Sequence, residues 1–282
     1  PPPYIGQSPP SPVRAPRSGL HRAGRAVAVG ALQGFARQFL RKRRPVVVAI
    51  AGNRGKTVVK RIVTGVLSPH IQTRANPRSY NTEIGLPLAV LGLEINPRAW
   101  RAITKTLVQA AWRGFTGQPA TQVLVLELGV RNPGDMAQLL RTVQPDWAVV
   151  TNLVSGEEDD PAAQAVLLEE LAHLLRSLPA DHVLVSSDDS LLSHLRQREN
   201  LQPALMARED LRLQPGGYHF RSEACAYTVG GDWSGDSSAY AFQAAAWLAE
   251  RLGLAPQAIQ QGLWAASGGD PETTPQQVAG GE

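Results

Sequence analysis

Short apolar runs alternate with amphipathic stretches along most of the chain after Pro45. The apolar runs are VVVAIA at 46–51, IQTRA at 71–75, QVLVLEL at 122–128, WAVVTNL at 147–153 and HVLVSS at 182–187. Helical patterns separate them, beginning near residue 56, twice within 83–113, and then over 135–141, 162–176 and 189–198. Strands that lack a polar face need cover on both sides, and alternating helices supply it. The pattern predicts an α/β fold with a mostly parallel sheet covered by helices on both faces.

The segment LRLQPGGYHFRSEACAYTVGG, residues 211–231, follows a different pattern. Two short runs with strand character flank Gly216-Gly217, and a glycine pair in this setting is typical of a hairpin turn. We therefore expect a small region of antiparallel strands near the C-terminal part. Two closing helices are predicted after it, the first ending at Gly253 and the second beginning near Pro256.

The chain ahead of the first apolar run has two parts. Residues 1–18 are rich in Pro and Ser and have almost nothing to bury, so we expect a disordered tail. Residues 19–44 carry several arginines and predict a basic amphipathic helix. Its apolar side chains at helical spacing are Val27, Ala31, Phe35 and Phe39. Such a helix either contacts an anionic membrane or a partner, or packs on the core with solvated arginines.

Charge is divided unevenly along the chain. The first acidic residue is Glu83, and 15 of the 28 Lys and Arg residues precede it, whereas the other 13 share residues 83–282 with all 24 acidic residues. A basic front part indicates an anionic partner, which is a nucleic acid, a membrane surface or a polyphosphate ligand. Few aromatic residues accompany the basic ones, so we expect no nucleic acid.

The single cysteine, Cys225, excludes an intramolecular disulfide framework and any CxxC metal site, and it suits a reducing cytoplasm. No apolar run reaches the length of a membrane-spanning helix. We expect a cytoplasmic protein, with peripheral membrane contact through residues 19–44 as an added hypothesis. The chain begins at Pro1 and ends in polar residues, so we expect a fragment or a processed form, with residues 267–282 as a disordered tail.

The stretch AGNRGKT, residues 51–57, is the strongest candidate for chemistry. An apolar strand runs directly into it and helix-forming residues follow, which is the context that a phosphate-binding loop requires. Its glycines let backbone N–H groups surround phosphate oxygens, its lysine adds a charge, and its threonine hydroxyl can bind Mg²⁺. The candidate nucleotide-binding residues are Gly52, Asn53, Arg54, Gly55, Lys56 and Thr57. The alternative is an ordinary glycine turn with an incidental lysine.

Glu127 is the one carboxylate in an apolar strand, and it stands at the carboxyl end, where ligands collect in parallel sheets. One interpretation is a ligand for Mg²⁺ bound to phosphate. The other is a strand-end glutamate that caps the following turn. The residues alone leave both open.

Two further groups of polar residues stand at the starts of predicted helices. Asn81 and Thr82 precede a helix that begins near Glu83, and their alternative role is plain N-capping. Asp188 and Asp189 follow a strand, where they either cap the next helix or contact a nucleotide.

Taken in order, these segments resemble the Mur ligase family. AGNRGKT is similar to that family's G-T-x-G-K-T loop, SYNTEIGLPLAVL to its N-N-E-I-G-x-P-L segment, and LVLELGVRNPGDMAQL to its E-x-G and G-D block. QPDWAVVTNL, VLVSSDD and SGDSSAYAFQAAAWLAERLGL resemble later family segments in the same order. The resemblance implies a P-loop-type ATP-binding central domain over residues 45–266.

The resemblance also implies an activity. In this family ATP phosphorylates a substrate carboxylate, and an amine then attacks the acyl phosphate to form an amide bond, here in peptidoglycan precursor synthesis. It implies ATP and Mg²⁺ as cofactors and Lys56 and Glu127 as catalytic residues. The implied contacts are Thr57, Glu127 and Glu157 for the metal, Asp188 and Asp189 for the nucleotide, and Asn81, Thr82 and Glu83 for the substrate.

Several family positions are changed in this chain. The family uses a carbamylated lysine to help hold its second metal, but no lysine follows Lys105. Glu157 stands near a family histidine, and Ser237, Ser238 and Ala241 stand where a histidine and two asparagines are expected. These changes favour a second hypothesis, a non-catalytic ATP-binding or scaffold protein derived from a ligase.

A third hypothesis is a ligase like the poly-γ-glutamate synthetases, whose G-T-R-G-K-S loop shares four residues with this loop. Family members usually carry further domains before and after the ATP-binding domain. We therefore expect a partner or another chain segment to supply a C-terminal ligase domain, together with a carboxylate and an amine as substrates.

Overall fold

The structure, a computed structural model, describes residues 19–76, 82–94, 100–153, 160–207, 210, 212–214, 217–223, 225–230 and 236–268. The predicted tail at 1–18 lies outside them, as does the predicted C-terminal tail at 267–282 except for its first two residues. Ser267 is buried and accepts the Gly230 N–H at 2.9 Å, so the prediction of a tail is wrong at this residue. Across the described ranges, every helix falls short of the length or the hydropathy that a membrane span requires.

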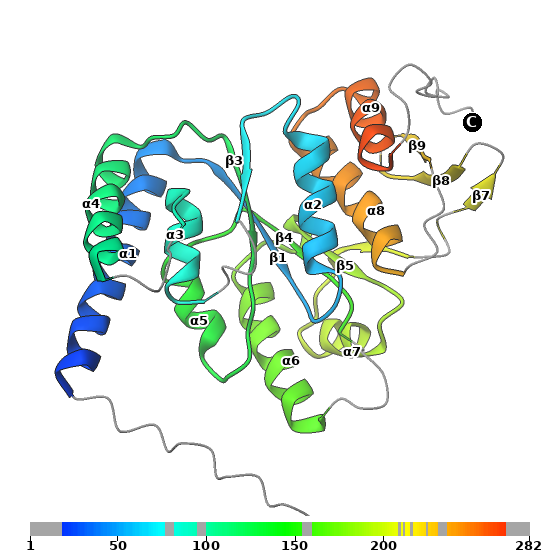
Figure 1. The fold of residues 1–282 in the computed structure, drawn as a ribbon. Coiled ribbons are helices and arrows are strands. Elements are labelled where there is room, and N and C mark those ends of the chain that lie inside the picture. Colours follow the sequence, from blue (N-terminus) through cyan, green and yellow to red (C-terminus); the bar gives the residue numbers. More distant parts are fainter. Residues whose placement is uncertain are drawn as a thin grey trace, which may run out of the picture.

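Within the described residues, six parallel strands form the central sheet in the order β2-β3-β1-β4-β5-β6 (Figure 1). They are β1 (Val46–Ala51), β2 (Thr73–Ala75), β3 (Val123–Glu127), β4 (Trp147–Val150), β5 (Val183–Ser186) and β6 (Ala204–Met206). Every neighbouring pair is parallel, which confirms the sheet that the apolar runs predict. The sequence pattern missed β6, because its three residues include no β-branched side chain.

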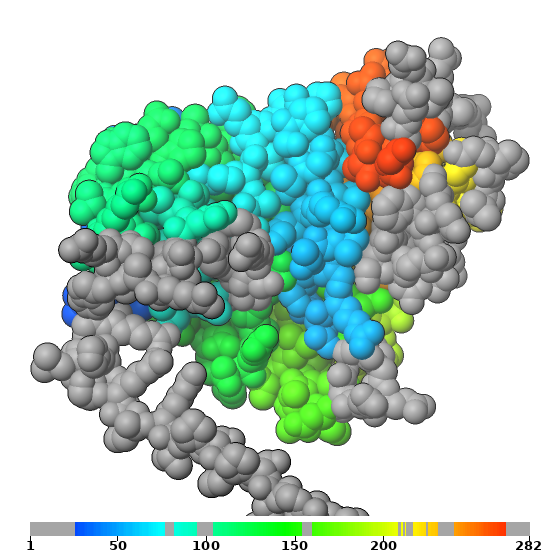
Figure 2. All heavy atoms as spheres, viewed as in Figure 1, coloured from blue at the N-terminus to red at the C-terminus, as the bar shows by residue number. Residues whose placement is uncertain are grey.

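Helices cover both faces of the sheet, and alternate residues of β1 enter two different cores. Val47 belongs to one core and Val48 to the other, because successive side chains of a strand point to opposite faces. The first core is covered by α1 (Gly19–Arg43), α3 (Gly85–Leu91), α4 (Trp100–Thr116), α5 (Asp135–Leu140), α6 (Pro161–Arg176) and α7 (Ser190–Arg198). The second is covered by α2 (Lys56–Leu67), α8 (Asp236–Arg251) and α9 (Pro256–Ala266). In the space-filling view, α2 lies beside α9 on one side of this sandwich (Figure 2).

Helix α1 packs its apolar face against α3 and α4. The residues of this face that are buried are Val29, Leu32, Ala36 and Phe39. Of the four apolar residues predicted from the sequence, Phe39 is buried and the half-buried Phe35 packs against the core, whereas Ala31 is only half-buried and Val27 is 74% exposed. The face toward the core is formed by residues spaced three and four apart, namely 29, 32, 36 and 39. This packing supports the interpretation of α1 as a core helix.

A small three-stranded antiparallel sheet lies beside α9 and confirms the predicted antiparallel region. Its strands are β7 (Arg212–Gln214), β8 (Gly217–Arg221) and β9 (Ala226–Val229). Gln214 pairs with Gly217, so the predicted turn falls between these strands, although Gly216 lies outside the described residues. Gln260 of α9 fixes the sheet, because its side chain accepts the Thr228 N–H at 2.9 Å and donates to the Thr228 carbonyl at 2.8 Å.

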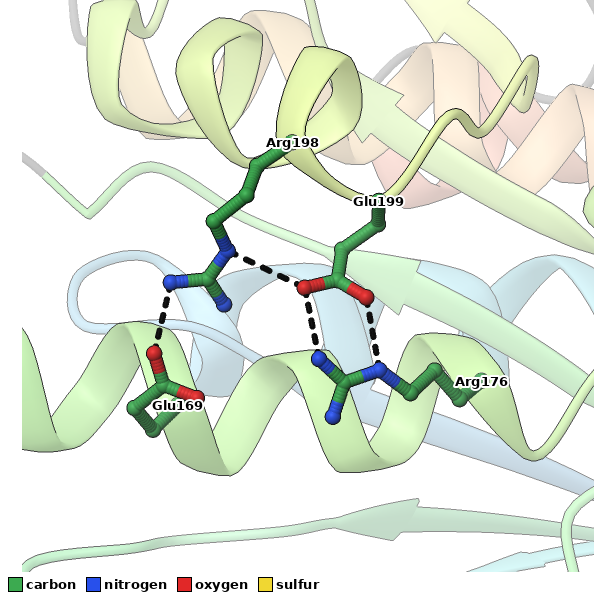
Figure 3. A network of polar contacts seen from close by, with 4 residues as sticks. All are labelled: Glu169, Arg176, Arg198 and Glu199. Atoms are coloured by element: carbon green, nitrogen blue, oxygen red, sulfur yellow. Dashed lines mark hydrogen bonds and ion pairs between the residues drawn. The ribbon is translucent and has the colours of Figure 1, made fainter.

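Four charged residues join α6 to the end of α7 (Figure 3). Arg176 donates two hydrogen bonds of 2.6 Å to Glu199. Arg198 donates to Glu169 at 2.6 Å and to Glu199 at 3.0 Å. The hydrogen bond from Arg176 is the main reason that the pKa of Glu199 lies below its usual value. Both arginines of this surface are therefore paired with carboxylates.

Candidate functional site

The loop between β1 and α2 is packed tightly against the end of β4. Gly52 has a φ of 123°, and a Cβ atom there would lie 2.7 Å from the carbonyl oxygen of Thr151. Only glycine avoids that contact. The N–H groups of Asn53 and Arg54 both donate to the Asn152 carbonyl at 3.1 Å. These bonds fix the path of the loop, and they leave neither of the two N–H groups for a ligand.

The first turn of α2 presents free backbone donors. Among the described residues, the N–H groups of Gly55, Lys56 and Thr57 have no hydrogen-bond partner. Gly55 precedes the helix with a φ of 85°, and no side chain caps the helix start. Unpaired N–H groups and the helix dipole both favour an anion at such an end. The start of α2 can therefore hold a phosphate group.

Lys56 folds back over this loop. Its ammonium donates to the carbonyl oxygens of Gly52 and Asn53, at 2.7 Å each. Burial lowers the pKa of Lys56 below the usual lysine value, Glu127 acts in the opposite direction, and Arg131 lowers it further. A bound anion would offset the desolvation of this ammonium, because an opposite charge nearby favours the charged form.

Glu127 is a buried carboxylate at the carboxyl end of β3, with only 4% of its surface exposed. Its Oε2 lies 3.2 Å from the Nζ of Lys60, and the Thr57 hydroxyl donates to it at 3.3 Å. Lys60, also buried, donates to the Asn76 carbonyl at 3.0 Å. The side-chain oxygen of Asn76 in turn accepts the Glu127 N–H at 3.0 Å. These contacts hold the carboxylate in one orientation beside the loop.

Thr57 and Glu127 offer two oxygen atoms to a cation. Mg²⁺ prefers oxygen ligands, and it takes one or two from the protein and the rest from phosphate and water. In the part of the chain that the structure describes, no group of three or more His, Cys, Asp or Glu side chains could hold a metal ion. Thr57 and Glu127 match the one or two protein ligands that Mg²⁺ takes when it binds together with phosphate. The third predicted ligand, Glu157, lies outside the described residues.

A cleft of about 880 Å³ opens beside the loop. The predicted residues that line it are Gly52, Asn53, Lys56, Thr82, Glu83 and Glu127. Further polar lining residues are Arg131, Asn132, Asp135, Gln138, Asp160 and Gln164. Its volume lies within the range of small-molecule sites. The fold thus brings the loop, the buried carboxylate and the segment at 82–83 to one cavity.

Two predicted substrate residues form one wall of this cleft. The Thr82 hydroxyl accepts the Gly85 N–H at 3.1 Å, so Thr82 caps the start of α3. The Glu83 carboxylate accepts a hydrogen bond of 2.9 Å from the Gln138 amide of α5. Asn81 lies outside the described residues. A substrate contact for this segment stays a prediction.

The loop between β3 and α5 is held rigidly at the mouth of the cleft. Asp135 accepts the N–H groups of Arg131 and Asn132 at 2.9 Å each. Glu170, buried on α6, accepts two N–H groups at the start of α5, at 2.7 and 2.6 Å. The backbone that carries Arg131 into the cleft is therefore fixed on both sides.

Asp188 and Asp189 do not line this cleft. Asp189 is buried, and it accepts two N–H groups of the first turn of α7, at 2.9 and 3.1 Å, and the Leu153 N–H at 2.6 Å. This carboxylate is a helix cap that also holds the segment after β4. Asp188 accepts the Tyr240 hydroxyl at 2.6 Å, and the pKa of Tyr240 is raised, first by burial and then by this bond. A nucleotide contact stays a prediction for both residues.

Sequence reasoning missed Lys60, Asn76 and Arg131. Lys60 follows Lys56 by one helical turn, so both lie on the same side of α2, and this spacing was an available signal. Asn76 follows a three-residue strand and Arg131 lies in a loop, so no periodic pattern marks either of them.

Known proteins are similar to this chain in sequence and in fold. No model of a known protein family matches the chain. The UDP-N-acetylmuramoyl-tripeptide--D-alanyl-D-alanine ligase of Bacillus subtilis (strain 168) is 25% identical over 239 residues, which are 83% of this chain and 47% of that protein. Among solved structures, MurF from Acinetobacter baumannii has a TM-score of 0.63 at 19% identity, covering 83% of this chain and 49% of that one. The MurF ligase from Thermotoga maritima in complex with ADP has a TM-score of 0.57 at 22% identity, covering 80% and 50%.

The structural likeness shows the fold, and the sequence similarity extends over most of the chain. The chain spans about half the length of the curated relative it matches. The order of the motifs, the parallel sheet and these similarities all agree. The chain is similar to Mur ligases in sequence, and it shares the fold of their solved structures.

Proposed function

We propose that the chain binds ATP at the Gly52–Thr57 loop and is the nucleotide-binding part of an ATP-dependent ligase that forms amide bonds. The observation that carries this proposal is the set of three free N–H groups at the start of α2, beside a lysine and a buried carboxylate. The ADP in the Thermotoga maritima structure supports a nucleotide as the ligand. Because the chain covers only 47% of its curated relative, ligation by the whole protein is part of the proposal.

The chain's own residues would compensate the charge of the triphosphate. The free N–H groups of α2 donate to phosphate oxygens. Lys56 leaves its two carbonyl partners for the phosphate, and Arg131 adds a second positive charge from the β3–α5 loop. Positioning and charge compensation are the main contributions of a protein to phosphoryl transfer.

Thr57 and Glu127 would hold Mg²⁺ in this proposal, with Glu157 as a further candidate ligand. When bound, the ion neutralises charge on the phosphate oxygens. Lys60 holds the Glu127 carboxylate in place through the contact of 3.2 Å. The ion therefore shares its carboxylate ligand with a buried lysine.

The similarity to a ligase supports the reaction class. The terminal phosphoryl group passes from ATP to a substrate carboxylate, and ADP leaves. An amine then attacks the carbonyl carbon of the acyl phosphate, and phosphate leaves as the amide bond forms. We place the carboxylate substrate in the cleft beside Thr82 and Glu83, with Asn81 as a further contact. The name of the Bacillus subtilis relative supports a muramoyl tripeptide and a D-alanyl dipeptide as substrates in peptidoglycan precursor synthesis.

Further partners are part of the same proposal. A C-terminal ligase domain, from another segment or another chain, would close over ATP and bring the amine. Peripheral membrane contact through residues 19–44 would have to use the basic residues of α1, because its buried apolar face already packs against α3 and α4. We propose a cytoplasmic location for the reaction.

A second candidate function is ATP binding without catalysis. The sequence has no lysine after Lys105 that could serve as the family's carbamylated metal ligand. Lys60 already occupies one side of the Glu127 carboxylate. Both observations favour a scaffold protein that still binds the nucleotide.

Titration with ATP tests the shared part of both functions. We expect the chain to bind ATP, and we expect Lys56→Ala to weaken the binding by about tenfold or more, because a charged hydrogen bond to phosphate is lost. Calorimetry measures both, with Arg212→Gln, at an exposed position of strand β7, as a matched control. Binding that does not depend on Lys56 would refute the proposed site.

Release of phosphate then separates the two functions. An enzyme releases phosphate from ATP only when a carboxylate and an amine substrate are both present. A scaffold binds ATP with the same dependence on Lys56 but releases no phosphate with any substrate pair, even after a C-terminal ligase domain is added.

A further inference from the structure

A second cavity lies at the amino ends of the central strands, opposite the phosphate-binding loop at their carboxyl ends. It has a volume of about 760 Å³ and lies among the end of α1, the start of β1 and the segment between α5 and β4. Four arginines line it, namely Arg37, Arg41, Arg44 and Arg141. We call this cavity the arginine cleft. The loop at Gly52 follows the carboxyl end of β1, whereas this cleft borders Val46 at its amino end.

The four guanidinium groups lack partners. Among the described residues, none of them makes a hydrogen bond or an ion pair, and the one acidic residue lining the cleft, Asp146, accepts the Val47 N–H at 2.7 Å. Three arginines elsewhere in the described structure are paired with carboxylates. Arg176 and Arg198 are bound to glutamates (Figure 3), and Arg251 pairs with Glu223. The arginine cleft therefore holds four positive charges, with no ion pair among its described residues.

The backbone at Arg44 adds an independent observation. Arg44 follows the last residue of α1, has a φ of 47°, and donates its N–H to the Leu40 carbonyl at 2.8 Å. Glycine is strongly favoured at this position, and any other residue is strained there. Arg44 is exposed and lines the arginine cleft with three other arginines, and an arginine kept at such a backbone position indicates a use for its charge.

The preference for cations at the C-terminal ends of helices explains only some of the four arginines in the cleft. Cations are favoured near the C-terminal end of a helix, which accounts for Arg41 in the last turn of α1 and for Arg141 after α5. Arg37 lies more than one turn earlier in α1, and Arg44 lies beyond the helix. Both still line the same cavity. The convergence of all four on one concave surface calls for an anionic ligand.

We propose that the arginine cleft binds a ligand with two or more phosphate groups. The planar fork of a guanidinium binds phosphate oxygens in pairs, and four of them match several negative charges. The volume suits a small ligand. A free polyphosphate and a membrane surface with several anionic lipid headgroups both present more than one phosphate group, and the experiment below separates them. The proposal does not depend on ATP binding at the loop.

The first arm of the test uses inorganic pyrophosphate and the 282-residue chain with Lys56→Ala, which disables the phosphate-binding loop. We expect pyrophosphate to bind this variant, and we expect added Arg37→Gln and Arg141→Gln to weaken the binding at least about tenfold. Arg212→Gln, on β7 outside the cleft, serves as the matched control and leaves binding unchanged. Circular dichroism and the thermal midpoint verify that each variant is folded.

The second arm uses vesicles of phosphatidylglycerol mixed with phosphatidylcholine, against vesicles of phosphatidylcholine alone. Flotation with the anionic vesicles that is lost in the Arg37→Gln, Arg141→Gln variant, without binding of pyrophosphate, identifies a lipid headgroup as the ligand. Binding of pyrophosphate without flotation identifies a free polyphosphate. The proposal is overturned if the folded chain binds neither probe, or if the double variant binds both as well as the parent.

Discussion

The ammonium of Lys60 lies 3.2 Å from the carboxylate of Glu127, and both side chains are buried at the end of β3. The pair joins the helix after the phosphate-binding loop to the strand that carries the proposed metal ligand. Burial makes each charge dependent on the other, because an unpaired charge away from water is costly. The geometry of the site and the stability of the fold are therefore linked at this contact.

Lys60→Met should destabilise the protein by about 3 to 5 kcal/mol, because it leaves the Glu127 charge buried without its partner. Urea unfolding measures the change in free energy. Arg61→Met, at the exposed neighbouring position, should stay within about 0.5 kcal/mol. Adding Glu127→Gln to Lys60→Met should recover much of the loss. Equal effects of Lys60→Met and Arg61→Met would contradict the buried pair.

Glu127→Gln should weaken the binding of Mg²⁺ without weakening the binding of metal-free ATP. The amide keeps the shape of the side chain but loses the negative charge that attracts Mg²⁺. We expect ATP to bind in EDTA as it does to the parent, whereas added Mg²⁺ no longer strengthens the binding. Calorimetry with and without EDTA measures both. An unchanged response to Mg²⁺ would remove Glu127 from the metal site.

Gly52→Ala should distort the loop and not merely strain the backbone. A Cβ atom there meets the Thr151 carbonyl at 2.7 Å, and the φ of 123° is already unfavourable for alanine. Gly253→Ala is the matched control, because its φ is also positive, at 78°, but nothing lies within 4 Å. We expect about 1 kcal/mol of destabilisation for Gly253→Ala, and a larger loss together with weaker ATP binding for Gly52→Ala. Similar losses for both would mean that the contact with Thr151 relaxes.

The lowered pKa of Lys56 predicts how ATP binding depends on pH. Burial disfavours the ammonium, so it loses its proton as pH rises through a value below the usual 10.5. The charged form binds phosphate, so ATP affinity should fall over this alkaline range. Lys56→Arg should bind ATP with an affinity that stays level there, because arginine keeps its charge. A parallel fall in both proteins would assign the pH dependence to another group.

Substitutions of the neighbouring residues Asp189 and Asp188 should lower the stability of the protein by different amounts. Asp189→Ala removes the cap of α7 and the partner of the Leu153 N–H, which should cost about 2 kcal/mol or more. Asp188→Ala removes an exposed carboxylate bound to Tyr240 and should cost much less. Thermal unfolding compares the two. If Asp188→Ala proves the more destabilising, the assignment of Asp189 as the structural cap is wrong.

The pattern of residues along the chain was sufficient to predict most of the strands, the helices and the phosphate-binding loop. Apolar runs such as 46–51 and 122–128 predict buried parallel strands, because no polar face is available for water. The glycines at Gly52 and Gly55 predict the loop, because their positive φ values are needed between that strand and α2. The short strand β6 escaped this reasoning, since tertiary pairing with β5 and not local preference makes it a strand.

The sequence by itself determined the alternation of strands and helices and the phosphate-binding loop, because both depend on residues close together along the chain. Only the tertiary structure decided which charges meet. It paired Lys60 with Glu127, brought Arg131 beside Lys56, and made Asp189 a saturated cap. It also gathered arginines from α1 and from the end of α5 into one cavity. Contacts between distant segments depend on how the layers pack, and no spacing along the chain records that packing.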